Sequence, residues 1–204
     1  TLSKKIENKK EVFAWSMYDF ANQPFTNLVV TFIYGTFFTT VIASNEIEGT
    51  QQWSHAVSIT AIIVALLSPV MGAVADRGGY RKLFMFGFTW LTIIATSILY
   101  FVLPGQVYLA LFWFIIANVG FEMGSVFCNA YLPDISHSKN IGRISGYGWS
   151  LGYVGGLIAL ALAMVFLVNA EVPIFGVGKG EVGAYENIRA TNLLVAIWFA
   201  VFSI

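Results

Sequence analysis

Two acidic side chains stand inside long apolar stretches of this sequence, and they are the residues best suited to chemistry. Glu122 lies among Asn118, Ser125 and Asn129, at spacings of four, three and four residues. A helix brings positions three and four apart onto one face, so these side chains are expected to form one polar stripe. Such a stripe requires a cavity or a second polar surface.

Asp19 is the second acid, and Asn22, three residues later, is expected to share its helical face. A charged side chain in hydrocarbon costs about 3 kcal/mol and usually marks a substrate or proton pathway. Each acid therefore has two interpretations. It takes up a proton or pairs with a cationic substrate amine, or it accepts hydrogen bonds from neighbouring helices and locks a bundle.

The elements that position these acids are predicted to lie in lipid. The 204-residue chain is 57% hydrophobic and 11% charged, whereas a soluble domain carries about 25% charged residues. An all-α membrane protein with six transmembrane helices is predicted, and Pro24 predicts a kink in the first helix. Because the last run is short, the chain is expected to be a fragment of a longer protein. The apolar runs fall at roughly 12–43, 54–75, 83–103, 106–132, 145–169 and 191–204.

Basic residues indicate the orientation of these spans, because Lys and Arg accumulate in cytoplasmic loops. If the amino terminus is cytosolic, only Lys179 and Arg189 fall on the outer side. Both ends of the segment are therefore expected in the cytosol, and the lipid bilayer is an expected partner. Zero formal charge gives no reason to expect nucleic acid. The basic residues on the cytosolic side are Lys4, Lys5, Lys9, Lys10, Arg77, Arg81, Lys82, Lys139 and Arg143.

The connection between the second and third predicted spans has the most specific local pattern. Gly72 permits close approach of another helix, Asp76 is expected to end the span, and Gly79 permits a tight turn. Arg77 and Arg81 would hold the turn at the cytosolic face. A plain basic turn would explain the two cations, but it would not explain an aspartate among them.

This connection resembles the loop signature of the major facilitator superfamily, Gly-x-Leu-Ala-Asp-Arg/Lys-x-Gly-Arg/Lys-Arg/Lys-x-Leu. Val74 replaces the leucine and Tyr80 replaces a basic residue. The resemblance implies a conformational latch, in which Asp76, Arg77 and Arg81 stabilise one state against a carboxy-terminal half. The matching residues are Gly72, Ala75, Asp76, Arg77, Gly79, Arg81 and Leu83.

Three further stretches, 15–22, 129–134 and 145–153, are similar to the branch of the vacuolar amino-acid effluxer linked to autophagy, which also has bacterial members. The resemblance implies that 1–204 is an amino-terminal six-helix domain with two inverted three-helix repeats. Their first helices, the first and fourth spans, line a central cavity. It also implies a missing carboxy-terminal half, amino acids as the leading substrate class, and a bacterial inner membrane or vacuolar membrane.

Glycines repeat every four residues in the fifth predicted span, at Gly148, Gly152 and Gly156. This spacing predicts a face that packs closely against another helix.

The function expected from these features is secondary transport by alternating access, exporting amino acids or similar small solutes, with proton coupling left open. The alternative is a polytopic membrane receptor or scaffold that transports nothing. The sequence has no metal-ligand cluster, no nucleotide-binding loop and no nucleophile with a plausible base. Neither an enzyme nor a cofactor is therefore expected.

Overall fold

In the computed structural model, residues 8–172 and 174–203 are described, and their secondary structure is entirely helical. The all-α prediction is therefore confirmed over these residues. Short π-helical and 3-10 segments, labelled η, continue or connect the α-helices. The elements are α1 (Lys9–Pro24), η1 (Phe25–Phe32), α2 (Tyr34–Phe37), η2 (Phe38–Ile42), α3 (Glu46–Gly78), α4 (Arg81–Leu99), α5 (Val107–Asn129), α6 (Leu132–Ile135), α7 (Ile141–Ala163), η3 (Met164–Val168), η4 (Ile174–Gly176) and α8 (Glu186–Phe202).

Five helical stretches in these ranges are long and apolar enough to cross a membrane, which makes the chain a multi-pass membrane protein. The sixth span was expected at 191–204. It corresponds to α8, which has 17 residues and is not among the five. The five stretches are Lys9–Ile42, Glu46–Gly78, Arg81–Leu99, Val107–Ile135 and Ile141–Val168.

The helix type changes directly after Pro24, at the place where a kink was expected. Proline has no N–H to donate to the preceding turn. From Phe25 the chain continues as a π-helix, and the N–H of Ile33 bonds to the carbonyl of Leu28, five residues back, at 3.1 Å. The first stretch therefore stays helical while its winding widens.

Helix α3 is longer than the expected span 54–75. Asn45 caps its start, because the Asn45 side chain accepts a hydrogen bond from the Glu48 N–H at 2.9 Å. The expectation that Asp76 ends the span was wrong by two residues. Gly79, with φ 68°, adopts the left-handed conformation that stops α3 after Gly78.

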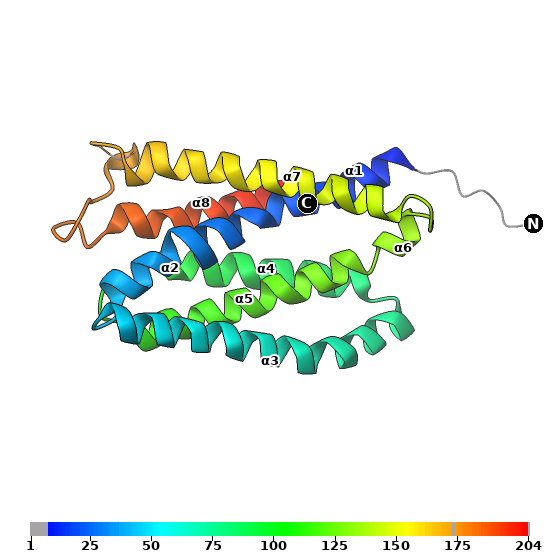
Figure 1. Cartoon of the computed structure of the whole chain (residues 1–204), viewed down its shortest axis with the longest axis horizontal. Coiled ribbons are helices and arrows are strands. Elements are labelled where there is room, and N and C mark those ends of the chain that lie inside the picture. Colours follow the sequence, from blue (N-terminus) through cyan, green and yellow to red (C-terminus); the bar gives the residue numbers. More distant parts are fainter. Residues whose placement is uncertain (1–7, 173, 204) are drawn as a thin grey trace, which may run out of the picture.

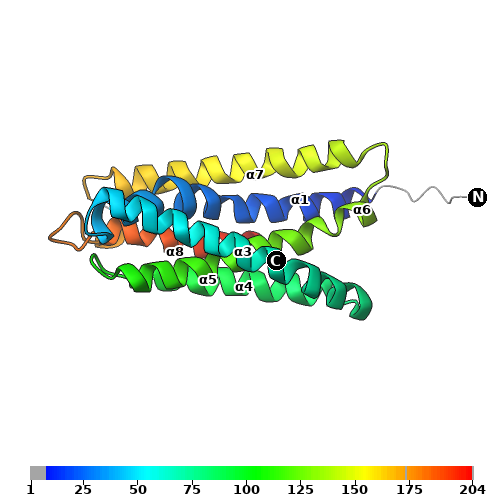
Figure 2. The ribbon, with the colours of Figure 1, turned by 60° about the horizontal axis from the view of Figure 1, so that its bottom comes forward.

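The six long helices form two groups of three, apart from the four-residue helices α2 and α6 (Figure 1). Helices α1, α7 and α8 make up one group, and α3, α4 and α5 make up the other. Within the groups, α1 packs on α7 and α8, and α5 packs on α3 and α4, while contacts between α4 and α8 join the groups. Figure 2 shows that all six run nearly along the long axis. This arrangement brings α1 and α5, which hold the two acids, into the same bundle.

Candidate functional site

Two contacts fix where α1 crosses α5. The hydroxyl of Tyr18 lies so close to Gly124 that a Cβ added there would be 2.6 Å from the oxygen. Further along the same helical stretch, at the start of η1, the ring of Phe25 stacks on the ring of Phe121 of α5, with centroids 5.0 Å apart. The two helices run in opposite directions between these contacts, since the numbering rises along one and falls along the other.

The sequence-predicted acids lie at the level of this crossing. Asp19 and Asn22 fall between Tyr18 and Phe25, and Glu122 falls between Phe121 and Gly124. Asn22 is buried, Asp19 is half-buried and Glu122 is exposed on the surface of the chain. Within the part of the chain that the structure describes, neither carboxylate has an ion-pair partner. Both groups can therefore accept a proton or a cation.

The polar stripe on α5 is only partly accessible. Asn118 is buried, Ser125 is half-buried, and Glu122 and Asn129 are exposed. Other sides of α5 are occupied by packing. A Cβ added at Gly120 would be 2.6 Å from the Thr92 hydroxyl of α4, and Met123 contacts Ser68 of α3. Glu122 takes part in neither of these contacts.

Four glycines of α7 face the helical stretch formed by α1 and η1, around and beyond Asp19. A Cβ added at Gly148 would be 2.5 Å from Oδ2 of Asp19, and one at Gly152 would be 3.4 Å from Cβ of the same residue. Gly156 packs against Asn27, and Gly155, which the four-residue repeat does not include, packs against Phe20. The spacing predicted a close contact, but only the structure identifies α1 as its partner.

The loop with the facilitator signature is held by Arg81. Its Nε donates to Oδ1 of Asp76 at 2.7 Å, and its Nη1 donates to Oδ2 of Asp134 in α6 at 3.0 Å. The sequence did not predict Asp134 as a partner of Arg81. Asp134 is, however, the last residue of the stretch 129–134 that carries a family resemblance. Arg77 is exposed, and no described atom beyond the adjacent backbone of α3 itself lies within 4 Å of a Cβ built at Gly72. The close helix approach expected at Gly72 is therefore not made within the described chain.

A second charged cluster, which the sequence did not predict, lies at the opposite end of the bundle. Arg189 is buried in α8 and donates to the main-chain carbonyls of Ala184 and Tyr100. The Tyr100 hydroxyl donates to Glu186 at 2.6 Å, and Glu186 also accepts from the N–H of Gly178 at 2.9 Å. The hydrogen bond to Glu186, with some burial, raises the pKa of Tyr100. This cluster ties the glycine-rich connection before α8 to the end of α4.

Comparison with known proteins finds one family and several relatives that this chain resembles. The family described as "Vacuole effluxer Atg22 like" matches residues 42–142. The MFS-type transporter YxiO of Bacillus subtilis (strain 168) is 27% identical over 201 residues, which cover 96% of this chain and 45% of that protein. The chain resembles the MFS-type transporters and the Atg22 branch.

Two further relatives cover different shares of the chain. A protein of Aquifex aeolicus (strain VF5) is 32% identical over 197 residues, 89% of this chain and 50% of that protein. Autophagy-related protein 22 of Coccidioides immitis (strain RS) is 37% identical over 79 residues, 39% of this chain and 13% of that protein. The chain thus spans about half the length of the two bacterial relatives. No solved structure matches it.

The Atg22-like match covers some candidate residues of this chain and not others. Residues 42–142 include the signature loop, Asp134 and the polar stripe with Glu122, whereas Asp19 and the α7 glycines that pack against the first helical stretch lie outside them. The names of the family and of the Bacillus relative describe transport proteins. They agree with the expectation that the chain is not an enzyme.

Proposed function

We propose that this chain is the amino-terminal half of a secondary transporter that moves amino acids or similar small solutes by alternating access. The observation that carries the proposal is a pair of carboxylates that have no ion-pair partner among the described residues. They are Asp19 and Glu122, at one level of the bundle on α1 and α5. The relatives support it, because the chain spans about half of their length and the family description names an effluxer.

The packing of the helices supports two three-helix repeats. In two related repeats, α1 corresponds to α5, α3 to α7 and α4 to α8. Under this correspondence the packed pair α1–α7 has its counterpart in the packed pair α5–α3. The pair α1–α8 likewise has its counterpart in α5–α4, and α4–α8 corresponds to itself. A bundle built from two related triplets has this property. In this proposal α8 is the sixth span, since 17 residues reach about 26 Å, close to the thickness of the hydrocarbon core.

Charge distribution supports a cytosolic location for the end of the bundle where α1 begins. Lys9, Arg81 and Arg143 belong to helix turns at this end, together with Lys10, Arg77 and Lys82, and Lys139 lies in the connection between α6 and α7. Lysine and arginine are retained on the cytoplasmic side of membranes. Lys4 and Lys5 lie outside the described residues.

In the proposed mechanism, the two carboxylates face a cavity shared with the other half of the protein. Glu122 takes up a proton or pairs with the amine of the substrate, and Asp19 assists from the seam between α1 and α7. The signature loop, held by Arg81, stabilises one of the two states. Rocking of the halves then exposes the carboxylates to each side of the membrane in turn.

Substitution of Glu122 in the full-length protein tests this proposal. Uptake of radiolabelled amino acids into proteoliposomes would be measured with and without an imposed pH gradient. Glu122→Gln keeps the size of the side chain but removes its charge, and it is expected to lower the gradient-driven flux at least about tenfold, which corresponds to about 1.4 kcal/mol. Glu181→Gln, in the exposed connection before α8, is the matched control and should leave the flux unchanged.

Two outcomes would contradict the proposal. Flux that stays pH-dependent and unchanged in Glu122→Gln would remove this residue from the mechanism. Absence of flux of any amino acid by the folded wild-type protein would reject the substrate class. Equal flux in the presence and absence of the gradient would exclude proton coupling while leaving transport in place.

A further inference from the structure

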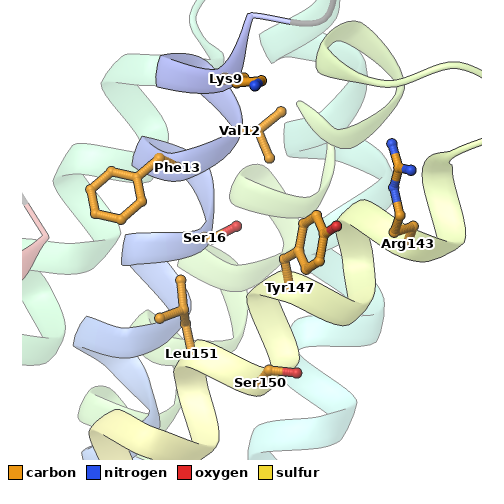
Figure 3. Close-up of a pocket in the computed structure, with 8 residues that line it drawn as sticks. All are labelled: Lys9, Val12, Phe13, Ser16, Arg143, Tyr147, Ser150 and Leu151. Carbon is orange, nitrogen blue, oxygen red and sulfur yellow. The ribbon is translucent and has the colours of Figure 1, made fainter.

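A pocket of about 530 Å³ opens between α1 and α7 at the end of the bundle where α1 begins (Figure 3). The proposed transport mechanism gives none of its lining residues a role in moving substrate or protons. Its polar lining consists of two cations and three hydroxyl groups, and no carboxylate lines it among the described residues. These side chains are Lys9 and Ser16 from α1 and Arg143, Tyr147 and Ser150 from α7.

Ser16 is an unusual member of this lining. The residue is only 1% exposed, and its hydroxyl has no hydrogen-bond partner in the described chain. Figure 3 shows this hydroxyl pointing from α1 toward the side chain of Tyr147, into the space between the helices. A buried hydroxyl without a partner is costly, and most such groups in proteins are satisfied. A ligand with acceptor oxygens would satisfy it.

The cations of the pocket stand at its outer rim. Lys9 is in the first turn of α1, about 10 Å along the helix axis from Ser16. Arg143 is in the first turn of α7 and also interacts within the chain. Its guanidinium carries five N–H donors, so it can hold more than one acceptor. Two cations at a rim with hydroxyls below them favour a phosphate group.

The remaining wall of the pocket is apolar. Val12 and Phe13 of α1 and Leu151 of α7 complete the lining, and the Phe13 side chain is 60% exposed. In a bilayer, basic side chains reach the phosphate level while apolar ones lie among acyl chains. The pocket therefore has the polarity of a lipid molecule at this depth, charged at the outer end and apolar along one side.

We infer that this pocket binds an anionic phospholipid, with the phosphate between Lys9 and Arg143 and an acyl chain along Val12, Phe13 and Leu151. The inference does not depend on transport. A free phosphate shares the headgroup chemistry but leaves the apolar wall unused. The lipid therefore should bind more tightly than the free anion.

Binding to the full-length protein in detergent tests the inference, with native mass spectrometry as the readout. The probes are dioctanoyl phosphatidylglycerol, dioctanoyl phosphatidylcholine and inorganic phosphate. Phosphatidylglycerol is expected to bind saturably and more tightly than phosphatidylcholine, and inorganic phosphate should not displace it. Each cation near a headgroup contributes about fivefold to affinity, so Lys9→Gln with Arg143→Gln should weaken binding about 25-fold.

Matched variants separate the pocket from general surface charge. Lys10→Gln removes a neighbouring cation of α1 that does not line the pocket, and it should leave the affinity unchanged. Ser16→Leu fills the floor of the pocket and should abolish saturable binding. Ser58→Ala, on exposed α3, is its control.

Three results would overturn the inference. One is phosphatidylglycerol affinity that survives the double substitution in a protein that elutes as a single folded species. Another is full displacement of the lipid by millimolar phosphate, which would identify a free anion as the ligand. The third is no binding at all to the folded full-length protein.

Discussion

The two ends of the bundle are held by charged residues in opposite environments. At the end where α1 begins, the Arg81 side chain is 32% exposed, and its partners Asp76 and Asp134 are 58% and 57% exposed. At the other end, Arg189 is 8% exposed, donates to two main-chain carbonyls and lies 5.4 Å from the centre of the Tyr100 ring. One arginine is solvated and the other is enclosed.

This difference in exposure predicts which of the two charged clusters can rearrange when the protein changes state. Exposed ion pairs contribute little to stability, because water and salt compete with them, and so they can form and break as a protein changes state. A buried guanidinium cannot leave its carbonyls without exposing them unpaired. In the proposed transporter, the Arg189 cluster keeps α4 and α8 together as one body, while the Arg81 cluster is the part that can switch.

The largest effect is expected from Arg189→Ala. The substitution leaves the carbonyls of Ala184 and Tyr100 without their donors, and it should lower the free energy of unfolding by about 2–4 kcal/mol. Titration of the purified full-length protein with sodium dodecyl sulfate would measure this loss. Arg77→Ala, an exposed cation at the other end, is the control and should have no measurable effect. Equal losses in the two variants would contradict the comparison.

A smaller effect at the same end is expected from Tyr100→Phe. This change removes only the hydroxyl that donates to Glu186 and keeps the ring beneath Arg189. Loss of this partly exposed hydrogen bond should cost under about 1 kcal/mol. The same denaturation assay measures it, with Tyr108→Phe, an exposed tyrosine of α5, as the control. A loss of unfolding free energy as large as that of Arg189→Ala would mean that the hydroxyl, not the guanidinium, stabilises this end of the bundle.

The helical, membrane-embedded character of the chain could be predicted from sequence because it follows from local composition and periodicity. Asp19, Glu122 and the signature loop stood out for the same reason, since a charge in an apolar run is visible without any fold. The end of α3 was misplaced by two residues, because a left-handed glycine stops the helix and the acid before it does not.

The contacts between distant segments could not be predicted in this way. Arg189 was assigned to an outer connection, yet its guanidinium is bound by a carbonyl 89 residues earlier in the chain. Arg81 and Asp134 are 53 residues apart. The glycine spacing on α7 indicated close packing, but many helices could have supplied the partner. Each of these pairings depends on how the two groups of helices come together, which single-segment patterns do not encode.

The smallest effect on unfolding is expected from Asp134→Asn, which sharpens the comparison at the Arg81 end. The substitution removes one charge from an exposed pair, so the denaturation midpoint should not change measurably. Its effect should appear instead in the balance of states. Spin labels on the full-length protein, one at Gly72 and one in the carboxy-terminal half, would report that balance by their distance distribution.

Asp134→Asn is expected to shift the distribution away from the state that the loop stabilises, and high salt should shift the wild-type protein in the same direction, because it screens exposed charges. Glu171→Gln, in the connection at the opposite end, supplies the control for charge removal. A shifted denaturation midpoint with an unchanged distance distribution would show that Arg81 and Asp134 brace the fold as Arg189 does. The two ends would then differ in exposure but not in role.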